Sequence, residues 1–288
     1  MKIPVLKITA VLLSLIFINT SFSQQKIEGV VLDVIDKKPV QYALVSIKNK
    51  AVFADADSAG RFVIYAFETD ILLISCTGFN GLQILVSSVS LSKIIELTPK
   101  MKILPTVYTG KFETKTIGIK SAKVSHSYSA NLNDRTEFAT LIKVTDNVNL
   151  YTLSKVSFVI HNKKKTGILC NPVRIHIYKV GADGIPSEEL LKEDVIVTEM
   201  NISKNRLIVD ISEQDITLSQ KSFFVSIQWL SVKGVTDYMQ PQISFTKTVR
   251  APLTWRKSDN LNQSQWFNPQ SSKFWGNMMV QTEIIVRQ

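Results

Sequence analysis

Residues 54–65 read Ala-Asp-Ala-Asp-Ser-Ala-Gly-Arg-Phe-Val-Ile-Tyr, and this stretch contains a turn that leads into a strand. Asp57, Ser58 and Gly60 are residue types that hydrogen-bond to nearby backbone or tolerate a left-handed conformation. Phe62 and Ile64 follow at alternate positions, as the buried face of a strand requires. We therefore expect a tight turn at Gly60, with a positive φ, between the two strands of a hairpin.

Further strand-like segments lie on both sides of this turn, at residues 28–33, 38–40, 43–47, 71–79 and 94–97. In this order they resemble the carboxypeptidase-regulatory-like domain, which also occurs as the N-terminal domain of TonB-dependent receptors. Its pattern runs G-x-V-x-D, P-x-x-x-A-x-V-x-I, T-D-x-x-G-x-F, L-x-x-S-x-x-G-Y and I-x-L. This chain departs from the pattern at Ala54 (usually Thr), Phe79 (usually Tyr) and Tyr42, where a small residue is common.

The resemblance covers residues 27–98 and implies an Ig-like or prealbumin-like β-sandwich of about seven strands. Apolar alternation with frequent turns, and the absence of long helical periodicity, independently favour a sandwich. We expect the inward-facing side chains to include Val30, Leu32, Val45, Ile47, Leu73 and Cys76.

A second all-β region is expected over residues 136–288. Its segments 155–160, 173–178, 223–229 and 278–286 alternate between apolar and polar residues, and residues 205–211 form a further strand. Residues 187–191 are expected to form a single helical turn. The order of these elements resembles the jelly-roll-like, galactose-binding-like sandwiches of exported bacterial proteins.

Residues 99–135 are rich in Lys, Ser, Thr and Asn, and we expect a linker with some edge strands. Within them, residues 101–110 resemble the short segment that follows the same domain in TonB-dependent receptors. Too few residues follow for the plug and barrel of such a receptor, so we expect no transporter.

Residues 1–23 have the pattern of a secretory signal peptide: Lys2 and Lys7, an apolar run over residues 8–17, and a small-x-small cleavage site before Gln24. An uncleaved N-terminal anchor is the alternative, although the apolar run is short for a membrane span. The chain is therefore expected to be exported, to the periplasm, the outer membrane or the cell surface. The predicted domains are residues 24–98 and 136–288.

The chain carries a formal net charge of +10. Its basic residues are scattered, and the densest group, residues 163–165, is best interpreted as a solvated loop. We expect no nucleic-acid partner, and at most a peripheral membrane association. Cys76 and Cys170 fall in different predicted domains and are interpreted as small buried hydrophobic residues, with an interdomain disulfide as the alternative.

Motifs of enzymatic chemistry are absent from the sequence. The three histidines, His126, His161 and His176, have no glutamate at zinc-ligand spacing, and there is no nucleophile motif or phosphate loop. The two aspartates of the Asp55–Gly60 turn lack the terminal glutamate of a calcium loop. His176 is interpreted as a polar residue on the outer face of its strand. We therefore predict no catalytic residue, metal or cofactor, and hence no enzyme.

Aromatic residues supply the candidate binding site. Trp255, Trp266 and Trp275 lie close together in the sequence, among amide side chains and Arg256. Flat rings beside amides and arginine are typical of sugar recognition, because stacking orients the ring while polar groups bind its hydroxyls. The alternative is that these rings plug one end of a sandwich.

The sequence thus predicts an exported, non-catalytic binding or adhesion protein of the bacterial envelope, with a glycan or an envelope protein as partner. Two alternatives remain: a structural periplasmic adaptor that meets protein partners through its N-terminal domain, and a hydrolase with an undetected site in the C-terminal sandwich.

Overall fold

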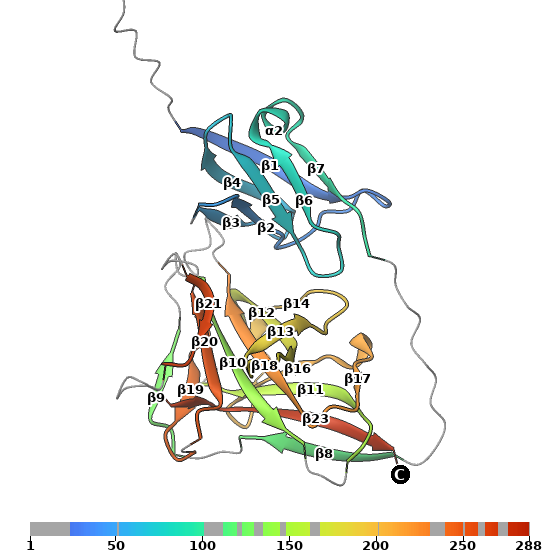
Figure 1. The fold of residues 1–288 in the computed structure, drawn as a ribbon, viewed down its shortest axis with the longest axis vertical. Coiled ribbons are helices and arrows are strands. Elements are labelled where there is room, and N and C mark those ends of the chain that lie inside the picture. Colours follow the sequence, from blue (N-terminus) through green and yellow to red (C-terminus); the bar gives the residue numbers. More distant parts are fainter. Residues whose placement is uncertain are drawn as a thin grey trace, which may run out of the picture.

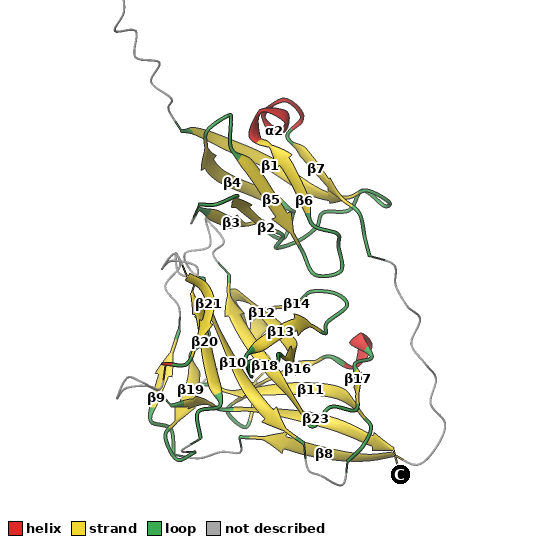
Figure 2. Ribbon diagram, in the orientation of Figure 1, coloured by secondary structure: helices red, strands yellow, loops and turns green. Residues whose placement is uncertain are grey.

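The computed structural model describes residues 24–50, 52–100, 112–119, 123–129, 135–144, 148–161, 168–200, 202–230, 240–249, 251–258, 263–269 and 276–287. The signal-like segment 1–23, the receptor-like segment 101–110 and the lysines at 163–165 lie outside these residues. The described chain is all-β, as predicted, apart from one short helix, α2 (Val86–Ser92), and short 3-10 turns such as η1 (Ser212–Gln214). Both α2 and η1 are red in Figure 2. No helix in the described part is long and apolar enough to cross a membrane.

The N-terminal sandwich consists of two sheets that enclose one apolar core (Figure 1). One sheet has the order β4-β1-β7, with β1 (Gln25–Asp33), β4 (Arg61–Ala66) and β7 (Ile94–Leu97). The other has the order β3-β2-β5-β6, with β2 (Leu44–Ile47), β3 (Phe53–Asp55), β5 (Ile71–Ser75) and β6 (Leu82–Leu85).

The turn at Gly60 has the predicted conformation, with φ of 72°. The Asp57 carboxylate fixes it by accepting hydrogen bonds from the backbone N–H groups of Ala59 and Arg61. The predicted hairpin is wrong, however, because β3 pairs with β2 while β4 pairs with β1. The turn carries the chain from one sheet of the sandwich to the other.

The predicted core is right for some strands and shifted by one residue in others. Val45 and Ile47 are buried, as are Phe62 and Ile64. In β1, by contrast, Ile27 and Val31 point inward, while Val30 and Leu32 are only half-buried. In β5, Leu72 and Ile74 enter the core, so Leu73 faces away from it. Cys76, just after β5, is half-buried and packs against this core. Both errors fall in continuous apolar runs, where alternation does not set the phase.

The C-terminal sandwich packs a seven-stranded sheet against a six-stranded one. The seven-stranded sheet contains β10 (Thr136–Lys143), β12 (Ile168–Val180), β13 (Pro186–Glu189), β14 (Val195–Met200), β18 (Ser222–Trp229), β20 (Thr254–Ser258) and β21 (Gln263–Phe267). The six-stranded sheet contains β8 (Phe112–Gly118), β11 (Tyr151–Val159), β15 (Ile202–Ser203), β16 (Arg206–Asp210), β17 (Thr217–Leu218) and β23 (Val280–Arg287). A small sheet of β9 (His126–Tyr128), β19 (Ile243–Thr246) and β22 (Asn277–Met278) completes it.

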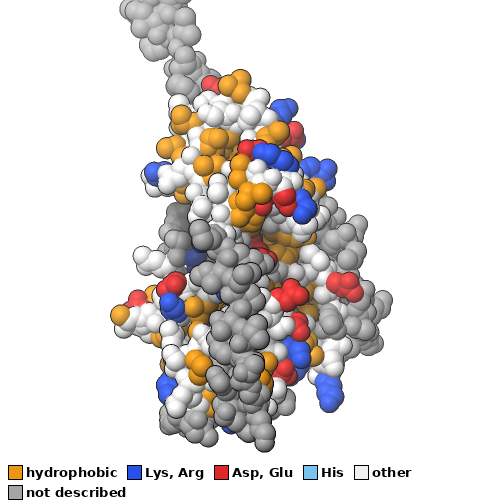
Figure 3. All heavy atoms as spheres, turned by 90° about the vertical axis from the view of Figure 1, so that its right-hand side faces the viewer, with side chains coloured by type: hydrophobic (Ala, Val, Ile, Leu, Met, Phe, Trp, Pro, Cys, Tyr) orange, Lys and Arg blue, Asp and Glu red, His pale blue; other side chains and the backbone are white. Residues whose placement is uncertain are grey.

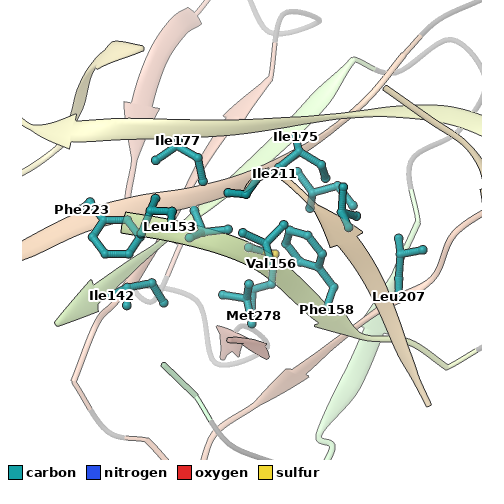
Figure 4. Packing of buried hydrophobic residues seen from close by; sticks show 14 of the residues in the cluster. Ile142, Leu153, Val156, Phe158, Ile175, Ile177, Leu207, Ile211, Phe223 and Met278 are labelled. Atoms are coloured by element: carbon teal, nitrogen blue, oxygen red, sulfur yellow. The ribbon is translucent and has the colours of Figure 1, made fainter. Parts of the chain in front are cut away.

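Side chains from both large sheets interdigitate in the core between them, among them Phe158 of β11, Ile175 of β12 and Phe223 of β18 (Figure 4). Two strands come from the predicted linker region: β8 pairs with β23, and β9 pairs with β19. The helical turn expected over residues 187–191 is wrong, since Pro186–Glu189 form β13 and pair with β12.

The Gly60 turn allows a direct test of backbone constraint. A Cβ atom added at Gly60 would lie 2.6 Å from the Val31 carbonyl oxygen, in addition to the positive φ. We expect Gly60→Val to lower the free energy of unfolding by about 1–3 kcal/mol in urea denaturation. Gly184 is the matched control because its φ is 78° but its Cβ would meet nothing within 4 Å. Equal losses for Gly60→Val and Gly184→Val would show that the clash with Val31 does not matter.

Candidate functional site between the two sandwiches

The outer face of the seven-stranded sheet carries a row of polar side chains. In the strand register, Glu137 of β10 lies opposite Gln228 of β18, and Gln228 lies opposite Arg174 of β12. Two residues further along β12, and so on the same face, His176 lies opposite Ser226 of β18. Directly opposed residues of antiparallel strands share a face, so these five side chains form one polar surface. We call it the polar floor.

The polar floor is buried although it faces away from the core of its own sandwich. Glu137 is 1% exposed, Arg174 5% and His176 8%. His176 lies on the outer face of its strand, as predicted, but this face is covered because the N-terminal sandwich lies over it. Figure 1 shows β2 and β3 of that sandwich above the strands of the seven-stranded sheet.

Glu137 is held as a carboxylate inside the interface. Its Oε1 accepts hydrogen bonds from the Ser226 hydroxyl at 2.5 Å and from the Tyr178 hydroxyl at 2.9 Å. Burial by itself raises the pKa of this carboxyl group, but His176, Lys257 and the two hydroxyl donors outweigh it, and the pKa is lowered.

Two carboxylates near His176 favour the charged form of its ring. Its Nδ1 lies 2.5 Å from Glu189 Oε2, its Nε2 lies 3.4 Å from Gln228 Oε1, and its ring stacks on Tyr178. Burial disfavours the charged ring, but the fields of Glu137 and Glu189 together with the hydrogen bond to Glu189 raise the pKa of His176 above its ordinary value.

Arg174 joins the two sandwiches. Its Nη2 donates to the backbone carbonyl of Tyr42 at 2.5 Å and to Asp194 Oδ2 at 3.2 Å. The Cys76 thiol donates to the same Asp194 oxygen at 2.8 Å. We call Tyr42, Cys76, Arg174 and Asp194 the interdomain latch. Beside it, the Tyr42 side chain packs with Leu230 of the C-terminal sandwich.

An ion pair also crosses the interface. Arg135, just before β10, lies 3.4 Å from Asp55 of β3, and both side chains are almost fully buried. Asp55 therefore serves in the contact between the sandwiches. Among the described residues, no group of three or more His, Cys, Asp or Glu side chains is arranged to hold a metal ion.

The sandwiches do not close completely over the polar floor. A cavity of about 990 Å³ lies between them. Its lower wall includes Glu137, Arg174, His176, Tyr178 and Gln228, and its roof, from β2, β3 and β5, includes Leu44, Ser46, Phe53 and Leu73. Leu73, the residue wrongly assigned to the core, thus lines the cavity.

The structure separates the predicted site residues. Trp266 meets Tyr178 edge-to-face with ring centroids 5.9 Å apart, and the Lys257 ammonium lies 5.9 Å from the Trp266 ring. Trp255 lies opposite Ala139 in the register, on the same face as Lys257. The guanidinium of Arg256 instead lies over the rings of Tyr128 and Phe138. Trp275 lies outside the described residues.

The two cysteines are free thiols. Cys170 is buried in the core of the C-terminal sandwich, as predicted. Cys76 differs: it lies in the interdomain latch, where burial, together with the negative charge of Asp194, raises the pKa of its thiol. It therefore acts as a protonated hydrogen-bond donor and not as a thiolate.

Ser226 and His176 are opposite one another, but they are not arranged as a nucleophile and its base. The Ser226 hydroxyl donates to Glu137, and the Nε2 of His176 faces Gln228. Nucleophile activation requires the serine hydroxyl to donate to the imidazole. The arrangement instead presents carboxylates, an amide and cations to a molecule in the cavity, next to the edge-to-face pair of Tyr178 and Trp266, which we call the aromatic corner.

One signal in the sequence points to the polar floor. Arg174, His176 and Tyr178 occupy alternate positions of one strand, and Ser226 and Gln228 do so in another. Such alternation identifies a shared polar face. It does not distinguish a face in water from a face covered by another domain.

Neither a family model nor a curated protein matches the chain. Among solved structures, it resembles the cysteine protease and lectin-like domains of Cwp84, a surface-layer-associated protein of Clostridium difficile, with 9% identity, a TM-score of 0.39, and coverage of 81% of this chain and 45% of that one. The major pilin subunit BcpA of Bacillus cereus is 12% identical with a TM-score of 0.20, and the match covers 92% of this chain and 69% of that one. The structure of infectious bursal disease virus, strain Gx, is 11% identical with a TM-score of 0.23, and the match covers 93% of this chain and 57% of that one. The chain spans less than half of the first structure, and similarities at these levels carry no functional conclusion.

The raised pKa of His176 predicts how stability depends on pH. The ring of His176 binds its proton more tightly in the native state than in the unfolded state. Its contribution to the free energy of unfolding is therefore complete below the unfolded-state pKa near 6.5, and it is lost as the pH rises through the higher native pKa. We expect the urea midpoint to fall as the pH rises above about 6.5, and His176→Gln to remove most of that fall.

His126 is the control, because burial lowers its pKa and its contribution has the opposite sign. His126→Gln should therefore leave the alkaline fall in place. If His176→Gln keeps the whole fall, His176 is not charged in the native protein.

The interdomain latch can be tested through Cys76. Removing Arg174 leaves Asp194 buried without its cation, which typically costs about 3–5 kcal/mol. We expect Arg174→Ala to loosen the interface and to speed alkylation of Cys76 several-fold, with Cys170 as an unreactive internal reference. Arg206→Ala, which removes a half-buried arginine of β16 away from the interface, should not change Cys76. Equal labelling in both variants would show that Arg174 does not hold the sandwiches together.

Proposed function

We propose that the protein is an exported, non-catalytic binding protein of the bacterial envelope whose partner is a glycan. The observation that carries this proposal is the aromatic corner of Trp266 and Tyr178 beside the polar floor. Sugar rings have apolar faces that stack on aromatic side chains and hydroxyl groups that need hydrogen-bonding partners. Trp266 and Tyr178 supply the first, while Glu137, His176 and Gln228 supply the second.

Export and the bacterial envelope are parts of the same proposal. They are supported by the signal-like sequence of residues 1–23 and by the resemblance of residues 27–98 to the carboxypeptidase-regulatory-like domain. The resemblance of residues 136–288 to the jelly-roll-like, galactose-binding-like sandwiches of exported bacterial proteins adds to this support. Co-purification of the protein with envelope fractions of its own host would support the proposal, whereas recovery of a chain with intact Met1 from the cytoplasm would contradict it.

A structural adaptor is the second candidate, and an apolar surface favours it. Leu85, Leu91 and Ile94 of the N-terminal sandwich are exposed, Leu91 to 89%. Figure 3 shows hydrophobic side chains distributed over this sandwich. An adaptor would retain an envelope protein through that surface, and replacement of Leu91 by Ser would release it. A hydrolase is the third candidate, and a screen with esterase, glycosidase and peptidase substrates would reveal it.

Tryptophan variants separate binding from folding. Trp229 is 2% exposed and donates its indole N–H to the Pro241 carbonyl, so Trp229→Ala should lower stability by about 3–5 kcal/mol. Trp266 is half-buried at the aromatic corner, so Trp266→Ala should cost less than about 1.5 kcal/mol and abolish glycan binding. Thermal melts and a glycan array measure both effects. Retained binding by a folded Trp266→Ala variant would exclude the aromatic corner as the platform.

A further inference from the structure

We propose that the ligand is a short, uncharged oligosaccharide held in the cavity between the sandwiches, and that the N-terminal sandwich forms the roof of its binding site. This inference rests on the glycan-binding function proposed above and adds the ligand's charge class and the second wall of its site.

The first argument is that both sandwiches build the cavity. Its lower wall is the polar floor, and its roof comes from β2, β3 and β5 of the N-terminal sandwich. Arg135 with Asp55 and Arg174 with the Tyr42 carbonyl hold the roof in place. The aromatic corner alone would offer one stacking surface, whereas the cavity can surround a ligand.

The second argument concerns charge. Most cations at the cavity wall already face a carboxylate: Arg174 faces Asp194, Arg135 faces Asp55, His176 faces Glu189 and Lys50 faces Asp70. Lys100, which is exposed, also lines the cavity. Lys257 lies near enough to Glu137 to lower the pKa of its carboxyl group. An anionic ligand would meet the carboxylates of Glu137 and Glu189, and a cationic one would meet the two guanidinium groups. The compensated wall favours a ligand without net charge.

The third argument concerns hydrogen-bonding capacity. Both hydrogen bonds that Glu137 accepts within the described part of the chain end on Oε1, which leaves Oε2 for another donor. The Nε–H of Arg174 is buried and finds no acceptor among the described residues. Donors and acceptors therefore occur side by side. A sugar hydroxyl both donates and accepts, so a polyhydroxylated molecule can satisfy both kinds of group.

The fourth argument concerns size. Ligand pockets have volumes of about 300–1,000 Å³, and this cavity, at about 990 Å³, lies at the upper end. A single sugar ring would leave much of it unfilled. A short chain of rings can extend along the polar floor to Tyr178, which lines the cavity and meets Trp266 edge-to-face.

The test uses the chain from Gln24 and titration calorimetry with four probes: maltotriose, cellotriose, N,N′,N″-triacetylchitotriose and trigalacturonate. We expect one of the three neutral probes to bind, with an affinity that changes less than about twofold between low and high salt, because uncharged ligands release few counterions. Trigalacturonate should bind at least tenfold more weakly. Preference for trigalacturonate, with strong salt dependence, would overturn the charge assignment.

Two variants and one matched control test the location of the binding site. Ser46→Phe fills the cavity from the roof, and Ser88→Phe makes the same change on the exposed surface of helix α2. Glu137→Gln keeps the shape of the polar floor but removes its charge. We expect Ser46→Phe and Glu137→Gln to weaken binding at least tenfold while Ser88→Phe has no effect, with thermal melts confirming that the variants fold.

The outcomes separate the two proposals. If glycans bind and Trp266→Ala abolishes binding, but a folded Ser46→Phe variant binds as well as the parent, the glycan-binding function stands and the cavity is not its site. If no glycan on the array binds and none of the four probes binds, both proposals fail.

Discussion

The arrangement of the two sandwiches depends on one buried guanidinium. Arg174 is 5% exposed and, because arginine does not give up its proton in proteins, it must be neutralised where it lies. Asp194 supplies the charge from its own sandwich, and the Tyr42 carbonyl supplies an acceptor from the other. Without the N-terminal sandwich, Arg174, Glu137 and His176 would lie on an open sheet face in water. The contact between the sandwiches thus creates the low-dielectric surroundings in which these charges interact strongly.

An interface built only for stability would have a different composition. Buried ion pairs rarely stabilise a fold more than well-packed apolar residues of similar size, because both charges lose their hydration. Here Glu137, His176 and Glu189 are kept beside a cavity, while the core of each sandwich consists of aliphatic and aromatic side chains. The concentration of charge beside this cavity is consistent with a surface that exchanges its hydrogen bonds with a ligand.

Local chemistry made part of this structure predictable. The conformation of Gly60 and the burial of Phe62 and Ile64 follow from turn residues and strand periodicity. The phase of Val30 and Leu32 does not, because Val31 between them is equally apolar and only packing decides which one turns inward. Alternation in β20 places Arg256 on the opposite face from Trp255 and Lys257. The separation of Arg256 from Trp255 could therefore have been predicted from the sequence. The burial of His176 could not, because it depends on residues more than a hundred positions away.

Tyr42 connects a departure in the sequence pattern with the contact between the two sandwiches. It departs from the pattern that resembles the carboxypeptidase-regulatory-like domain, it has a positive φ of 55°, and its side chain packs with Leu230 while its carbonyl accepts from Arg174. A β-sandwich alone gives no reason for a large residue in a left-handed conformation, which is unfavourable for non-glycine residues. Gly78, which fits the pattern, serves the same contact, because a Cβ there would lie 2.9 Å from the Lys192 carbonyl oxygen. One position departs from the pattern and the other keeps it, and both allow close approach of the C-terminal sandwich. Docking of that sandwich therefore explains the Tyr42 departure, which the fold of the N-terminal module by itself does not require.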